Sequence, residues 1–124
     1  MNNQDVVDNN DEELFKKRIN VRKKGKVGEL EFVSLLVEKG YEARRSGNQA
    51  GDRGQAAIFP DIIDNSPFAW EVKRVEGGIN PYKMIEQSEK NAGDKIPAVA
   101  YRKNGKRWLA VVYVENLLEL IKEQ

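Results

Sequence analysis

The stretch that decides the fold is Phe59–Arg74, FPDIIDNSPFAWEVKR. In residues 68–74, large apolar side chains alternate with small or charged ones, as they do along a β-strand. The two faces carry Phe68, Trp70 and Val72 on one side and Ala69, Glu71 and Lys73 on the other. Residues 57–63 form a shorter apolar run that Pro60 interrupts, and Asn-Ser-Pro at residues 65–67 is typical of a turn. The stretch therefore predicts two neighbouring strands.

Helices and further strands are predicted on both sides of this stretch. In chain order they cover residues 26–39 (helix), 41–45, 57–63 and 68–74 (strands), 80–92 (helix), 97–101 and 108–113 (strands), and 114–122 (helix). Gly40 is expected to end the first helix, Asn80-Pro81 to begin the second, and Asn104-Gly105 to form a hairpin turn. The order α-β-β-β-α-β-β-α predicts an α/β fold with a central mixed sheet flanked by helices.

The composition excludes several kinds of chemistry. The 124 residues include no cysteine and no histidine, which rules out disulfides, thiolate and imidazole metal ligands, and Ser-His or Cys-His catalytic pairs. Catalysis then requires carboxylates, lysine or a metal held by oxygen ligands. The chain lacks the glycine-rich motifs of nucleotide sites and any apolar run long enough to span a membrane. Because its first residues are polar and acidic, unlike a signal peptide, we expect a soluble cytoplasmic protein without a nucleotide cofactor.

The charges are distributed unevenly. Residues 1–13 carry five acids and no base, and we expect them to form a disordered acidic arm before a single domain over residues 14–124. The 101 residues from 14 to 114 hold 20 basic and 12 acidic side chains, and seven of the bases lie in residues 16–26 without an acid among them. A basic body favours a polyanionic partner such as nucleic acid, although a solvated helix surface is the ordinary alternative.

Four charged residues occupy positions where the local pattern calls for apolar side chains. Glu29 falls within the apolar face of the helix over residues 26–39, whereas Glu31 falls on its polar face. Asp61 interrupts an apolar strand, and Glu71 and Lys73 share one face of the next strand. Such charges are costly to bury without a partner, and local rules tend to fail in this way at functional sites. For Glu29 the alternative is a salt bridge to a buried arginine or lysine. If the four groups converge, they suit a metal-dependent phosphodiester hydrolase.

Pro60-Asp61, followed after nine residues by Glu71-Val72-Lys73, resembles the motif of the PD-(D/E)xK nuclease superfamily. The predicted order of helices and strands is also similar to the restriction-endonuclease-like core of that superfamily. Within it, the chain looks most like the archaeal-type Holliday junction resolvases and their phage relatives. The similar segments are KGKVGELEF (24–32), GYEARRSG (40–47), FPDII (59–63) and WEVKR (70–74).

The resemblance implies an active site and a partner. Asp61, Glu71, Glu29 and the carbonyl of Val72 are expected to bind Mg²⁺ or Mn²⁺, and Lys73 is expected to position the attacking water. The family acts as a homodimer, in which each active site cuts one strand of a four-way DNA junction inside the cell or, for a phage protein, inside the bacterial host. The residues that we predict to contact DNA are Lys24, Lys26, Arg44, Arg45, Ser46, Arg53, Arg74 and Gln87.

Three functions stay open on the sequence alone. They are a resolvase of branched DNA, a nuclease of the same chemistry acting in repair, restriction or replication, and a catalytically inactive relative that only binds DNA or a protein. The complete set of three carboxylates and one lysine favours the first two. Some residues also have ordinary interpretations: Gln87 as a surface residue, Arg74 as a partner of Glu76, and four bases as a common charged turn. These four bases are Arg102, Lys103, Lys106 and Arg107.

Overall fold

The computed structural model describes residue 13, residues 25–46 and residues 60–124. Several predictions fall outside the described residues: those on residues 1–12, Lys24, Arg53 and the first part of the strand expected at 57–63. Glu13, the last residue of the expected arm, is helical and exposed. The boundary between the arm and the domain therefore stays a prediction.

The observed order of helices and strands is the predicted one. Among the described residues the first helix covers 25–38. The other elements are β1 (Ala43–Arg45), β2 (Ile62–Asp64), β3 (Phe68–Arg74), α2 (Pro81–Asn91), β4 (Ile96–Arg102), β5 (Leu109–Val111) and α3 (Val114–Lys122). β3 has the predicted bounds, whereas β1, β2 and β5 are shorter than expected.

The strands form two sheets in the described part of the chain, instead of the one sheet expected. β1 and β2 pair antiparallel, and β3, β4 and β5 form a mixed sheet in that order. β3 and β4 run parallel, connected through α2, and β5 returns antiparallel to β4. Beside β2, the backbone N–H of Val72 in β3 donates to a side chain, Asp61 Oδ2, at 2.9 Å.

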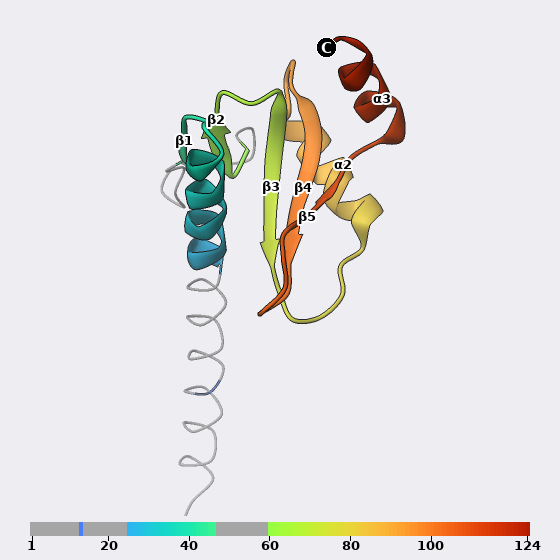
Figure 1. The fold of residues 1–124 in the computed structure, drawn as a ribbon. Coiled ribbons are helices and arrows are strands. Elements are labelled where there is room, and N and C mark those ends of the chain that lie inside the picture. Colours follow the sequence, from blue (N-terminus) through green and yellow to red (C-terminus); the bar gives the residue numbers. More distant parts are fainter. Residues whose placement is uncertain (1–12, 14–24, 47–59) are drawn as a thin grey trace, which may run out of the picture.

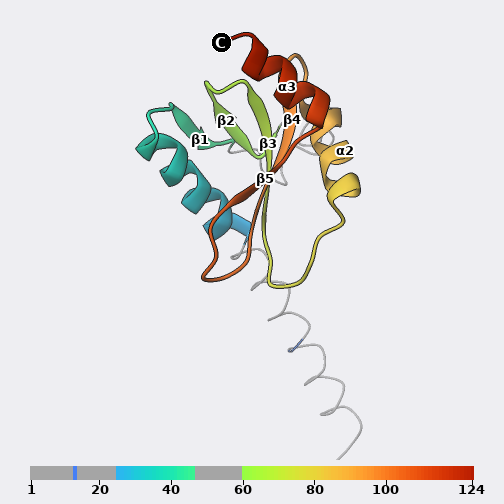
Figure 2. The same cartoon turned by 45° about the vertical axis from the view of Figure 1, so that its right-hand side comes forward.

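Helices cover both faces of the mixed sheet. Figures 1 and 2 show the first helix and the β1–β2 pair on one side of β3, and α2 on the other side of β3 and β4. α3 lies at one end of the sheet, and the loop between β4 and β5 lies at the opposite end. None of the described helices is long and apolar enough to cross a membrane.

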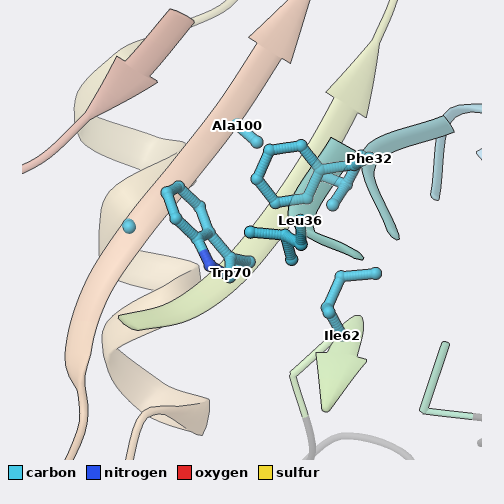
Figure 3. Close-up of a cluster of buried hydrophobic side chains, with 7 residues drawn as sticks. Phe32, Leu36, Ile62, Trp70 and Ala100 are labelled. Atoms are coloured by element: carbon cyan, nitrogen blue, oxygen red, sulfur yellow. The ribbon is translucent and has the colours of Figure 1, made fainter. Parts of the chain in front are cut away.

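The main core lies between the first helix and the mixed sheet (Figure 3). Phe32 meets Trp70 edge to face, with ring centroids 4.8 Å apart. The alternation predicted for β3 is confirmed, since Trp70 and Val72 belong to this core while Ala69 is buried outside it. Burying each large apolar side chain contributes about 1.5–3 kcal/mol, so this cluster fixes the helix against β3. Its members are Phe32, Leu36, Ile62, Trp70, Val72, Ala98 and Ala100.

Local signals set the ends of the helices where the sequence predicts them. Gly40 has φ +97°, and the backbone N–H groups of Gly40 and Tyr41 donate to the carbonyls of Val37 and Leu36. This is the glycine-terminated Schellman arrangement. At the start of α2, Asn80 Oδ1 accepts the backbone N–H of Lys83 at 3.2 Å, and Pro81 occupies the first turn.

Candidate active site

A cavity of about 400 Å³ opens at the carboxyl end of β3, toward the start of the first helix. All four charged residues that break the local sequence pattern line it, so the predicted convergence is observed. The lining residues are Gly25, Glu29, Asp61, Glu71, Val72, Lys73, Arg74, Val75 and Glu76.

β3 supplies the centre of the site. Glu71 and Lys73 lie on the same face because they are two residues apart in a strand. Glu71 is buried, and its Oε1 lies 3.8 Å from Lys73 Nζ. Asp61 precedes β2, and the backbone N–H of Val72 fixes its carboxylate against β3. Asp61, Glu71 and Lys73 are therefore held together by the backbone geometry of two adjacent segments.

The first helix brings Glu29 to the same cavity through a close approach to β3. Gly28 is buried, and a Cβ at this position would lie 2.8 Å from Arg74 Cβ. The carboxylate of Glu29 accepts a hydrogen bond from Arg45 Nε at 2.8 Å. Glu29 thus lines the cavity and also forms the ion pair with an arginine that was the alternative, while its role as a metal ligand stays a prediction.

The ion pair occupies one of the metal ligands expected from the sequence. Within the described residues, no group of three or more acidic side chains is arranged to hold one metal ion. The Arg45 guanidinium holds one carboxylate oxygen of Glu29 at 2.8 Å, where a metal ion would have to compete with it. The remaining oxygen donors are the carboxylates of Asp61 and Glu71 and the carbonyl of Val72.

Burial makes the acids of the cavity hard to ionise. It raises the pKa of Glu71 to about 7, and the negative charge of Asp61 adds to the effect. Burial also raises the pKa of Asp61, although the N–H of Val72 and the charge of Lys73 oppose the rise. The pKa of Glu29 is raised by burial too, against the hydrogen bond from Arg45. Such a carboxyl pair keeps a proton near neutral pH unless a cation replaces it.

The fold has a known counterpart among solved structures. This chain superposes on Hjc of Archaeoglobus fulgidus, a Holliday junction resolvase from an archaeal hyperthermophile, with a TM-score of 0.58 and 22% sequence identity. The match covers 71% of this chain and 76% of the resolvase chain. The two chains share a fold. A scan of protein families and a search of curated proteins find no match.

The shared fold confirms the predicted α/β class, with helices packed around a mixed sheet. The neighbour is also a resolvase, the kind of protein that the sequence motifs resemble. The identity of 22% is low, so the likeness concerns the fold, and the roles of individual side chains rest on the geometry of this chain.

The residues predicted to contact DNA lie in several places. Lys26 and Arg44 are exposed, on the first helix and on β1. Arg45 is bound to Glu29, and the backbone N–H of Ser46 donates to the carbonyl of Asp61 at 3.0 Å. Gln87 is exposed on α2 and is not one of the residues that line the cavity. Lys24 and Arg53 are outside the described residues.

Glu31 does not line the cavity, but it holds Arg74, which does, and the sequence pattern missed this contact. A helical wheel places Glu31 on the polar face, yet it is half-buried and pairs with two arginines from neighbouring parallel strands. Its Oε1 lies 2.8 Å from Arg74 Nε, and its Oε2 accepts from Arg102. Arg74 therefore pairs with Glu31 and not with Glu76. The only local signal was the small residue at Gly28, which allows the helix to lie close to β3.

Proposed function

We propose that this chain is a divalent-metal-dependent DNA endonuclease that cuts branched DNA, with four-way Holliday junctions as its substrate. The observation that carries the proposal is the meeting of Glu29, Asp61, Glu71 and Lys73 in one cavity. The fold shared with a Holliday junction resolvase supports the choice of substrate. An enzyme of this kind acts where DNA is recombined, inside the cell or inside the host of a phage.

The donors at the cavity suit Mg²⁺ or Mn²⁺. Asp61, Glu71 and the carbonyl of Val72 offer hard oxygen atoms of the type that these ions prefer. The buried carboxyl group of Glu71 and the half-buried one of Asp61, both with raised pKa values, are also a place where a cation relieves charge repulsion. When bound, such an ion lowers the pKa of water and screens negative charge on phosphate. Glu29 adds a further acid at the rim if it releases Arg45.

The side chains of the protein then orient the reaction. Lys73, beside Glu71, holds the attacking water and stabilises the negative charge that develops on the phosphate. Attack occurs in line with the leaving 3′ oxygen, so the expected products carry a 5′-phosphate and a 3′-hydroxyl. Lys26 and Arg44, exposed outside the cavity, contact the DNA backbone in this proposal.

A second copy of the chain completes the enzyme. One chain has one such cavity in its described part, whereas a four-way junction requires one cut in each of two strands. We therefore propose a homodimer, in which the two-fold symmetry of the protein matches that of the junction.

The decisive experiment is a cleavage assay with Mg²⁺. A labelled four-way junction is compared with linear duplex, flap and single-stranded DNA of the same sequence, and Glu71→Gln serves as the inactive control. Paired symmetric nicks on the junction alone are the expected result. Equal cutting of the other substrates would indicate a general nuclease, and binding without cutting would contradict the enzyme proposal.

A further inference from the structure

The turn between β4 and β5 forms a basic hollow. A cavity of about 420 Å³ lies there, and four of its lining residues are cationic. The lining residues are Tyr101, Arg102, Lys103, Lys106, Arg107 and Leu109. Residues 101–110 contain no acid. The charged turn that is unremarkable in the sequence is thus a concave, cationic surface in the fold.

Most of this charge is not neutralised by acidic side chains in the described part of the chain. Arg102 is held by Glu31 and lies 6.0 Å from the centre of the Trp108 ring. Lys103, Lys106 and Arg107 are exposed and have no acidic partner among the described residues. Three unpaired cations so close together repel one another, and a chain of phosphates is the partner that would neutralise them.

The hollow is fixed next to the candidate active site. The backbone N–H of Asn104 donates to both carboxylate oxygens of Glu76, at 3.2 and 3.0 Å, and Arg74 donates to Asn104 Oδ1 at 3.1 Å. Tyr101 Oη donates to the carbonyl of Gly77 at 2.9 Å. Because Arg74 and Glu76 also line the active-site cavity, these bonds tie the two surfaces together. Figures 1 and 2 show the turn at the same end of the sheet as the carboxyl end of β3.

We propose that the β4–β5 turn is a second DNA-binding surface, at which Lys103, Lys106 and Arg107 bind backbone phosphates beyond the position that is cut. The inference rests on the proposed function, because it takes DNA as the polyanion. DNA fits better than a single phosphate ligand for two reasons. The cations come from both sides of an exposed turn, at residues 103, 106 and 107, and the surface adjoins a cavity suited to phosphodiester chemistry. A rigid turn also positions the phosphates with little loss of conformational entropy.

The test measures DNA binding in EDTA, where cleavage plays no part. A variant with Lys103→Ala, Lys106→Ala and Arg107→Ala is compared with wild type by fluorescence anisotropy on a labelled duplex and a four-way junction. The control carries Lys39→Ala, Lys90→Ala and Lys122→Ala, which removes the same charge from exposed positions elsewhere. Salt is varied from about 50 to about 200 mM.

The turn variant is expected to bind DNA more weakly. The slope of the logarithm of its association constant against log salt concentration should be smaller in magnitude by about 2 to 3, because each phosphate contact contributes about 0.9. The control variant should keep the wild-type slope. Equal slopes in the two variants would overturn the inference, since net charge alone would then explain binding. The proposed function is tested separately by cleavage. If the wild-type protein cuts no DNA but only the turn variant changes the slope, the turn binds DNA and the nuclease proposal is contradicted.

Discussion

The acid pair of the cavity, Asp61 and Glu71, makes the stability of the fold depend on pH. Glu71 is buried beside Asp61, and its pKa is raised to about 7. In the unfolded chain the same carboxyl titrates near its ordinary value of 4.5. As the pH rises between these two values, the unfolded state releases the proton while the folded state keeps it. The stabilising contribution of the protonated form is therefore lost as the pH rises toward 7.

Without divalent metal, we expect Glu71 to reduce the free energy of unfolding by about 2–3 kcal/mol between about pH 5 and about pH 8, at about 1.4 kcal/mol per pKa unit. Glu71→Gln cannot ionise and should lose most of this dependence, while Asp61 keeps a part of it. Urea unfolding at both pH values in EDTA measures the difference. A variant with the same pH dependence as wild type would show that Glu71 is already ionised at low pH.

Substitution of Lys73 distinguishes its effect on the rate of cleavage from its effect on DNA affinity. Its ammonium group lies beside Glu71 and lines the cavity, so Lys73→Ala should reduce kcat by at least about a hundredfold, as loss of a group that stabilises developing charge does. DNA affinity in EDTA should remain close to that of wild type, because one cation among many contributes little to binding. Single-turnover cleavage and anisotropy measure the two quantities. Near-normal turnover by this variant would remove Lys73 from the mechanism.

The contact between the first helix and β3 depends on a residue without a side chain. A Cβ on Gly28 would press against Arg74 Cβ, which is attached to the backbone of β3 and cannot swing away. We expect Gly28→Ala to destabilise the protein by about 1–3 kcal/mol through overpacking, despite the helix preference of alanine. The displaced helix would also weaken the contact between Glu31 and Arg74, and cleavage should fall with it.

Gly25→Ala is the matched control for this prediction, because nothing lies within 4 Å of a Cβ built at Gly25. It should be neutral or stabilising by up to about 1 kcal/mol, as expected for alanine in an exposed helix. Thermal unfolding of both variants compares the two positions. Equal stability of the two variants would show that the helix can move away from β3 at no cost.

The ends of the helices and the β4–β5 turn could be predicted from the sequence, whereas the contacts between distant elements could not. Gly40, Asn80 and Asn104-Gly105 act on their own turns, so the ends of the elements follow from local patterns. Asp61, Glu71 and Lys73 are visible because they break such patterns. The pair between Glu29 and Arg45 and the bridge from Glu31 depend on how the helix meets distant strands. Local periodicity carries no information on such contacts, and for the same reason the division into two sheets was not predicted.

The outer surface of the whole molecule carries an apolar stripe opposite the basic turn. α3 has no buried residue, and Val114, Leu118 and Ile121 are 60–65% exposed at a spacing that places them on one helical face. Tyr82 of α2 is also largely exposed. An apolar stripe of this kind is typical of a surface covered by another protein. The proposed homodimer supplies a second copy of the same stripe as the partner, at the end of the sheet away from the β4–β5 turn (Figure 1).

We therefore expect the protein to have twice the 14.1 kDa mass of the chain in solution, and Leu118→Gln with Ile121→Gln to convert it to a monomer. Each apolar side chain buried in the interface contributes about 1.5–3 kcal/mol to association. In a symmetric dimer the double variant removes four such side chains, two from each subunit. Glutamine adds no charge, so DNA electrostatics stay unchanged, and Glu119→Gln on the same helix is the control. Light scattering after size-exclusion chromatography gives the masses. The monomer should nick one strand of a junction without the paired second cut, whereas a dimeric double variant would place the interface on another face.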